Sequence, residues 1–469
     1  MAKLRRPYSD AMSPRMQAIA PFGGDSLGGA AGVAPVTGHG RDGHSTSESA
    51  TTRLSAPLAT RLARSSQSAY SVNTGFNTRK DGAVAETADV VIVGGGVVGA
   101  SIAYHLAEAG CTNVLVLERE PHLGRGSTGK SMGGVRAQFS TEINIRMSLY
   151  SLDFFARFEA ATGCPAGYRA QGYLFVATRE KELDYLRTNH PLQAACGVKT
   201  VELLSPTDVL RMMPQLRADD ILGGSFNSTD GFVDPYSVMT GFIERAKAEG
   251  VRLWKDAEVT AIEQDAKGIA GVATRRGTVA TRTLVNAAGP WAAQVAALAG
   301  VELPVEPLRR MLVPSEPFPL ISREAPMTID MATGFHFRPE GLGVLLAWSD
   351  PDETPGFKTQ FDPDFVEKIL VRAVDRVPCF EALEVNHKRA WAGLYEMTPD
   401  HYPILGPVPE VPGLYLANGF SGHGVMHSPA TGKVLADLIL QGHTSLIDAH
   451  ALDLARFAEG RQIQETAIL

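Results

Sequence analysis

The chain has 469 residues, of which 44% are hydrophobic and 20% are charged, and its formal net charge at pH 7 is −7. This length and apolar content allow a large buried core and are typical of about two to three domains. The negative charge argues against a nucleic-acid partner, and because no apolar run reaches about eighteen residues we expect no membrane span.

Residues 1–86 are rich in Ser, Ala, Gly and Arg and lack hydrophobic periodicity, which predicts a disordered extension. Residues 51–80 contain several arginines and no acidic residue, which is typical of an organellar transit peptide. Acidic residues precede this segment, however, whereas a transit peptide begins at the N-terminus. A plain linker and a mis-chosen start codon are therefore the other interpretations.

The four cysteines, Cys111, Cys164, Cys196 and Cys379, show no CxxC spacing. Neither a disulfide framework nor a metal site is indicated, so we interpret them as reduced residues of an intracellular protein. We expect a cytoplasmic location, with the mitochondrial matrix as the alternative if the N-terminal extension is a transit peptide.

Residues 90–106, VVIVGGGVVGASIAYHL, combine a β-branched run, a glycine-rich turn and a helical pattern. Gly94 permits the tight turn, Gly96 lets the backbone approach a pyrophosphate, and Gly99 lets the helix pack on the strand. A second strand at 113–117 ends before Glu118, whose carboxylate can hold a ribose hydroxyl pair. This order predicts an adenine dinucleotide site; a structural glycine turn in another α/β protein is the alternative.

The middle of the chain predicts βα units interrupted by a meander. We expect a strand at 173–177 followed by a helix, and a helix at 233–250 that begins at Asp234-Pro235 and ends at Gly250. Short strands between 251 and 286 follow, with a turn at Arg276-Gly277.

A second glycine-rich loop lies near the C-terminus. The segment GLYLANGFSGHGVMHSPATGKVLADLI, residues 413–439, predicts a strand, a loop and then a helix with Pro429 in its first turn. If both glycine-rich loops meet one extended ligand, that ligand is FAD rather than NAD.

The chain from about residue 88 to residue 442 resembles the D-amino-acid oxidase family of flavoproteins, and especially the sarcosine oxidase β-subunit and related amino-acid dehydrogenases. The motifs that carry the resemblance are DVVIVGGGVVGASIAYHLAEAG, GRGSTGKSMGGVRAQFS, DGFVDPYSVMTGFIERAKAEG, VNAAGPWA, AGLYEMTPDHYPILGP and GFSGHGVMHSPATGKVLADLI, in family order. The resemblance implies an α/β fold with a Rossmann-like FAD-binding domain (87–168, 233–304 and 386–445), a mixed-sheet substrate domain (169–232 and 305–385) and a C-terminal tail (446–469).

The resemblance also implies the site residues. The cofactor contacts it implies are Gly94, Gly96, Gly99, Glu118, Arg125, Ser127, Thr128, Lys130, Ser131, Val259, Gly289, Trp291, Gly422, His423, Gly424 and Met426. Arg136 resembles the arginine that binds the substrate carboxylate; by its position alone it is also compatible with a salt bridge. His336 and Phe337 fall on the strand expected over the flavin, although a lone strand histidine is more often simply packed. No metal site is expected.

Departures from the relatives predict how the cofactor is held. Gly393 stands where the monomeric oxidases carry a cysteine bonded to flavin, and Val233 stands where the β-subunit carries an FMN-linked histidine. We therefore expect one non-covalent FAD. Met426 replaces a lysine that contacts the substrate carboxylate, and Leu345 replaces a lysine that promotes reaction with oxygen. Leu345 favours a dehydrogenase, unless Lys130 or protonated His423 supplies the charge.

The implied activity is oxidation of a C–N bond in a secondary or primary amino acid, similar to sarcosine, dimethylglycine or proline, by hydride transfer to flavin N5. Oxygen, a quinone or an electron-transfer protein would accept the electrons. The alternative is an FAD-binding assembly factor for a respiratory complex, which would have partner subunits. An NAD(P)H-dependent disulfide reductase is disfavoured, because the chain lacks a redox CxxC and a second dinucleotide fingerprint.

Overall fold

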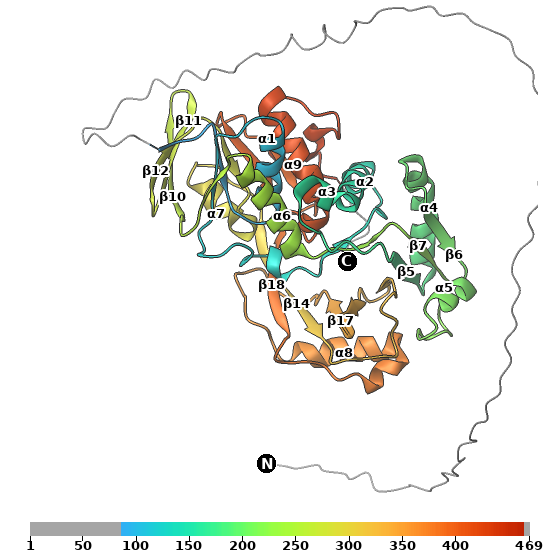
Figure 1. Cartoon of the computed structure of the whole chain (residues 1–469). Helices are drawn as coiled ribbons and strands as arrows, with labels where there is room; N and C mark the ends of the chain where they lie inside the picture. The colour runs from blue at the N-terminus through green and yellow to red at the C-terminus, as the bar shows by residue number, and fades with distance from the viewer. Residues whose placement is uncertain (1–85, 464–469) are drawn as a thin grey trace, which may run out of the picture. The chain divides into compact units, whose positions relative to one another are not determined.

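The computed structural model describes residues 86–463 (Figure 1). Residues 1–85 of the predicted extension lie outside the described residues, while Glu86 begins the short strand β1 (Glu86–Thr87). No helix within the described residues is long and apolar enough to cross a membrane.

A six-stranded, mostly parallel sheet contains the glycine fingerprint. Its strands, in spatial order, are β19 (Ile404–Pro407), β20 (Leu414–Asn418), β13 (Leu284–Asn286), β2 (Val90–Val93), β3 (Val114–Leu117) and β9 (Arg252–Trp254). Only β19 and β20 pair antiparallel. Every residue of β2 and β3 is buried, because both faces of a parallel sheet are covered.

Helices cover one face of this sheet. Here α1 (Val97–Glu108) contacts α6 (Pro235–Ala248) and α9 (Gly424–Gln441), and these helices lie side by side in Figure 1. Further helices, α2 (Glu142–Ala156) and α3 (Phe158–Thr162), pack against α9 and α6. This arrangement is the predicted Rossmann-like part of the fold.

The other face packs against a small sheet and a short helix. The small sheet has the order β1, β12 (Gly277–Ala280), β11 (Gly268–Thr274) and β10 (Val259–Asp265), and the helix is α7 (Ala292–Ala297). Val91 and Leu115 of the parallel sheet share one apolar core with Ile269 and Ala296 of these elements. The predicted meander is confirmed, with Gly277 (φ 132°) at its turn.

An eight-stranded mixed sheet forms the second large part. In spatial order its strands are β18 (Trp391–Met397), β14 (Glu306–Pro314), β17 (Gly343–Trp348), β16 (His336–Glu340), β15 (Met327–Asp330), β5 (Tyr173–Ala177), β7 (Gly223–Asn227) and β6 (Val201–Leu204). Only β15 and β5 pair parallel. The helices are α4 (Glu180–Ala195), α5 (Pro206–Met212) and α8 (Phe365–Arg376). Two short strands, β4 (Gly134–Val135) and β8 (Gly231–Phe232), pair separately.

The starts of two helices can be compared with the start signals in the sequence. The Asp234 side chain accepts a hydrogen bond from Ser237 N (2.6 Å) and caps α6, as the sequence predicts. In contrast, α9 begins at Gly424, so Pro429 lies inside the helix rather than in its first turn. Pro429 has no N–H to donate to Val425 O, four residues earlier in the helix. The Ser428 hydroxyl donates to Val425 O instead (2.8 Å), so the helix tolerates the proline.

The strand pairing bears on two of the predicted domain boundaries. The sequence predicts that residues 386–445 belong to the FAD-binding domain, whereas β18 belongs to the eight-stranded sheet through its pairing with β14. It predicts a tail at 446–469, whereas Arg456 is fully buried and pairs with Asp400 (2.8 Å). The division into domains stays a prediction.

Candidate functional site

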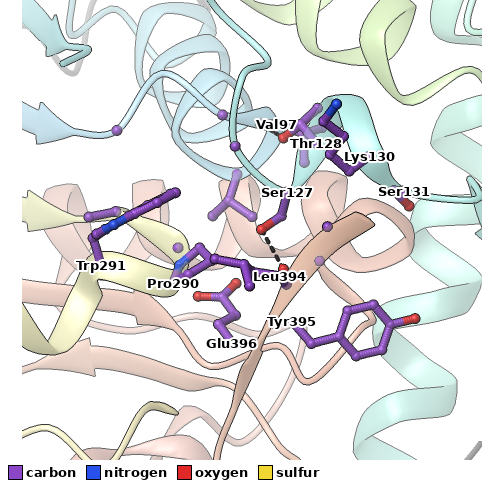
Figure 2. Close-up of a pocket in the computed structure, with 18 of the residues that line it drawn as sticks. Val97, Ser127, Thr128, Lys130, Ser131, Pro290, Trp291, Leu394, Tyr395 and Glu396 are labelled. Carbon is purple, nitrogen blue, oxygen red and sulfur yellow. Dashed lines mark hydrogen bonds between the residues drawn. The ribbon is translucent and has the colours of Figure 1, made fainter. Parts of the chain in front are cut away.

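One cavity of about 390 Å³ runs from the carboxyl ends of the parallel strands to the eight-stranded sheet. Its wall combines the β2–α1 turn, the loop before α2, the start of α9 and strands β14, β16, β17 and β18. Figure 2 shows side chains of several of these segments around one space. A ligand in it would contact residues that lie far apart in the sequence.

Most of the predicted cofactor residues meet in this cavity. Those that line it are Gly94, Gly96, Glu118, Arg125, Ser127, Thr128, Lys130, Ser131, Val259, Gly289, Trp291, Gly422 and Gly424, together with His336. Gly99, Arg136, Phe337, His423 and Met426 are not among the lining residues.

The glycines of the fingerprint keep the first strand-to-helix turn tight. Gly94 has φ 110°, and a Cβ on it would lie 2.3 Å from Ala287 O. A Cβ on Gly99 would lie 2.0 Å from Gly94 O, so this glycine serves helix packing instead of ligand contact. Gly96 lines the cavity, where a bare backbone can approach a phosphate.

Two side chains stabilise this turn from outside. Glu118 accepts hydrogen bonds from Gly95 N (3.0 Å) and Glu120 N (2.9 Å), and burial raises the pKa of its carboxyl. Thr128 Oγ1 accepts from Val97 N (3.0 Å). Both residues hold the turn in shape, and both also line the cavity.

The segment 125–131 crosses from the parallel sheet to β18. The Ser127 hydroxyl donates to Leu394 O (2.6 Å), as Figure 2 shows, and Trp391 Nε1 donates to Lys130 O (3.0 Å). A Cβ on Gly393 would lie only 2.6 Å from Lys130 Cβ. Close packing against Lys130 therefore requires a glycine at position 393, where the sequence predicts that no covalent attachment is made.

Trp291 forms part of the wall between two other side chains. The Arg119 guanidinium lies 3.7 Å from the centre of the indole, and the Phe357 ring stacks on it at 5.7 Å with an interplanar angle of 21°. These contacts place the segment that connects β17 and α8 beside the cavity.

Arg136 is a buried cation without an acidic partner among the described residues. Its Nη2 donates to His423 Nε2 (3.4 Å), its guanidinium lies 4.5 Å from the Phe139 ring centre, and its Nε has no partner. Burial, and then the charge of Arg136, lower the pKa of His423 well below its ordinary value. His423 is therefore neutral and supplies no positive charge.

Asp230 orders the segment that follows β4 and carries Arg136. It accepts hydrogen bonds from Ala137 N (2.8 Å) and Gln138 Nε2 (2.9 Å). Burial raises the pKa of Asp230 to about 7. The carboxyl thus fixes the backbone next to Arg136 without pairing with the guanidinium.

His336 and Phe337 lie on opposite faces of β16. His336 lines the cavity, and its Nδ1–H donates to Gly334 O (2.9 Å). Burial lowers its pKa to about 4, and Arg136 contributes in the same direction, so the ring is neutral at pH 7. Phe337 instead packs on Phe380 (5.1 Å) in the core beneath α8, because neighbouring strand residues alternate in direction. It does not form a cavity wall.

Met426 is likewise buried in the helical core, away from the cavity lining. Among the lining residues that the prediction missed are Arg310, Tyr395 and Glu396. Tyr395 and Glu396 belong to the AGLYEMTPD segment already singled out, but no local signal distinguishes Arg310 from Arg309. Burial raises the pKa of Glu396 to about 7, although its carboxyl accepts from Gly419 N (3.0 Å).

Comparison with known proteins assigns the chain to a family. A family model described as FAD dependent oxidoreductase (DAO) matches residues 89–438. The chain belongs to this family. FAD is thus the cofactor of this protein, and the predicted family and fold class are confirmed.

Several relatives of this FAD-dependent oxidoreductase have descriptive names. Bos taurus FAD-dependent oxidoreductase domain-containing protein 1 is 34% identical over 436 residues, covering 82% of this chain and 87% of the bovine protein. Mitochondrial dimethylglycine dehydrogenase of Rattus norvegicus is 30% identical over 407 residues, covering 81% of this chain but 46% of that protein. The crystal structure of L-proline dehydrogenase from P. horikoshii is similar with a TM-score of 0.75 and 31% identity, covering 80% of this chain and 99% of that one.

The residues present fit FAD. The bare backbone at Gly96 and the α1 N-terminus suit a pyrophosphate, and Glu118 lies at the end of β3, where a ribose would lie. Bound FAD supplies a two-electron acceptor that amino-acid side chains lack.

Proposed function

We propose that this FAD-dependent oxidoreductase oxidises a C–N bond of a secondary or primary amino acid by hydride transfer to the flavin. The observation that carries this proposal is Arg136, a buried guanidinium with no carboxylate partner within residues 86–463. An unpaired buried cation is costly unless an anion joins it, and a guanidinium can bind both oxygens of one carboxylate. The names of the dimethylglycine and L-proline dehydrogenases support an amino-acid substrate.

The roles of the chain's own groups follow from their protonation states. Arg136 would orient the substrate carboxylate, and neutral His336 would border the amine without repelling a positive charge. Phe139 and Tyr173, whose rings lie 4.5 and 5.9 Å from the Arg136 guanidinium, exclude water around it. Orientation and exclusion of water suffice for this chemistry, so no nucleophile or paired acid and base is needed.

We also propose that FAD is held without a covalent bond and that a dehydrogenase reaction is favoured over an oxidase reaction. Leu345 packs with Leu312 and Ala347 in an apolar cluster, and the neutral His423 offers no charge in compensation. This apolar cluster would give a developing superoxide anion no stabilisation of its own, so any stabilising charge would have to come from Lys130 or Arg310, which line the same cavity.

An anaerobic substrate panel tests the proposed function. Sarcosine, dimethylglycine, proline and glycine are mixed with the oxidised holoprotein, and bleaching of the flavin absorbance is followed. Arg136→Ala should weaken binding of the active compound by about 2–5 kcal/mol, because it removes a buried charge-assisted contact. Its FAD content should not change, and the exposed Arg169→Ala should behave like the wild type.

Failure of every amino acid to bleach the flavin would contradict the proposal. Tight FAD binding together with co-purifying subunits would then favour the assembly-factor alternative. Equal reduction rates and equal affinities in Arg136→Ala and the wild type would remove Arg136 from the substrate site.

A further inference from the structure

Arg310 faces the cavity from β14, while its neighbour Arg309 is used elsewhere. Arg309 Nε pairs with Glu353 Oε2 (2.6 Å), and Arg309 Nη1 donates to Gln360 O (2.9 Å). Arg310 is paired in register with Gly393 of β18 and lines the cavity. Arg309 therefore holds the segment between β17 and α8, whereas Arg310 forms part of the cavity wall.

Arg310 has no acidic partner among residues 86–463. Its Nη1 donates to the neighbouring Arg309 O (3.1 Å), and its Nε is buried without any partner. Burial lowers the pKa of the guanidinium, but arginine stays charged in proteins. Glu353 and Asp350 attract this charge from a distance without forming an ion pair, so an anion directly beside the guanidinium would stabilise it further.

The position of Arg310 restricts what that anion can be. The fingerprint turn, where the pyrophosphate is expected, belongs to the parallel sheet, whereas Arg310 belongs to the eight-stranded sheet. Its guanidinium lies 5.5 Å from the Tyr395 ring centre, and a Cβ on Gly422 would lie 2.4 Å from that same ring. Arg310 is therefore close to the loop that begins α9, whose N-terminus is also electropositive. Arg136, in contrast, does not line this cavity.

We propose that Arg310 is the cation that faces the flavin ring and offsets the negative charge that the ring gains when it is reduced. The proposal rests on FAD binding, which the family shows, and on no particular substrate. A substrate carboxylate is the other possible anion of the same chemistry, and the experiment separates the two sources.

The test uses the holoprotein and needs no amino-acid substrate. Sulfite adds its lone pair to flavin N5, forms an N–S bond and leaves the ring with a negative charge, so its affinity reports the local potential. Arg310→Met and Arg310→Gln should weaken sulfite binding at least tenfold. They should also lower the two-electron midpoint potential by about 30 mV or more, the equivalent of that tenfold change. Arg310→Lys should stay within threefold of the wild type, and exposed Lys181→Met should match the wild type.

Three results would overturn the proposal. Unchanged sulfite affinity and potential in both neutral variants, with weaker acetate binding, would assign Arg310 to a carboxylate ligand. A lysine variant as impaired as the neutral ones would show that charge is not the cause. Loss of FAD from all three variants would make the guanidinium a structural group. None of these measurements depends on whether an amino acid reduces the flavin. Failure of the Arg310 proposal can therefore be distinguished from failure of the proposed function.

Discussion

In the eight-stranded sheet of this flavoprotein, neighbouring residues of a strand point to opposite faces, and this decides which side chains face the cavity. On β16, His336 faces the cavity and Phe337 the core. On β17, Leu345 and Ala347 cluster with Leu312, while their neighbours pack beneath α8. A shift of one residue would exchange these environments, so each substitution has to be judged by the face that it occupies.

A cation at position 345 should increase the reaction with oxygen. Leu345 is buried beside Leu312 and Ala347, which line the cavity. Leu345→Lys should raise the rate of reoxidation of the reduced protein by about tenfold or more, corresponding to roughly 1.4 kcal/mol of stabilisation of the developing anion. Stopped-flow mixing with oxygenated buffer measures this rate, with Leu345→Met as the neutral control. Rapid reoxidation of the wild type that outpaces dye reduction would contradict a dehydrogenase.

Glu396 should make stability depend on pH. Burial raises its pKa from 4.5 to about 7, so between these values the folded chain binds more protons than the unfolded chain. The contribution of this group is therefore complete below about pH 4.5 and is lost as the pH rises through about 7. The free energy of unfolding in urea should therefore be compared between Glu396→Gln and the wild type at two pH values. The difference should favour the variant more at pH 8 than at pH 5. The exposed Glu381→Gln serves as the control, and parallel pH profiles of Glu396→Gln and the wild type would be the contrary result.

At the scale of elements, the segment between β17 and α8 connects the eight-stranded sheet to the cavity wall. Glu353 is almost fully buried and pairs with Arg309 (2.6 Å) and Lys358 (2.8 Å). Gly356 N donates to Pro307 O (2.7 Å), and Phe357 then stacks on Trp291. The segment thus holds a half-exposed ring against a residue of the cofactor cavity.

Removal of that ring should speed FAD release. Phe357→Ala deletes an aromatic pair worth about 0.5–1.5 kcal/mol, so we expect FAD to dissociate roughly two- to tenfold faster. The recovery of flavin fluorescence after dilution measures the rate. Phe357→Tyr keeps the stacked ring and should match the wild type, and equal rates for the alanine and tyrosine variants would separate this segment from cofactor retention.

At the scale of the whole molecule, the C-terminal segment completes the core around β18 and β19. Arg456 Nε and Nη2 bond both oxygens of Asp400 (2.8 and 2.9 Å), and Nη2 also donates to Tyr402 O (2.9 Å). Neither side chain of the pair is exposed beyond 1%. The segment after α9 therefore neutralises a charge buried between the strands.

Loss of Arg456 should destabilise the whole fold. Arg456→Ala leaves Asp400 buried without its cation, which typically costs about 3–5 kcal/mol in the free energy of unfolding. Chemical denaturation of the holoprotein measures this loss. Arg461→Ala removes a surface arginine that pairs with Asp453 and Glu459, and it should have little effect. If Arg456→Ala were as stable as Arg461→Ala, the C-terminal segment would not contribute to the core.

Several features of this protein can be predicted from local patterns in the sequence. The buried run 90–93, the glycines at 94, 96 and 99, and the Asp234 cap act between residues only a few positions apart, and the structure has them as predicted. The family motifs identified FAD for the same reason, since a strand, a turn and a helix are contiguous in the chain.

The remaining features could not be predicted from local patterns, because they depend on contacts between distant segments. The directions of Arg309 and Arg310 follow from the register of β14 with β18, not from the two identical residue types. The start of α9 at Gly424 depends on burial of the helix against α1 and α2, which outweighs the local signal of Pro429. The pairing of Arg456 with Asp400 joins positions 56 residues apart, and no local pattern specifies which carboxylate a buried arginine will meet.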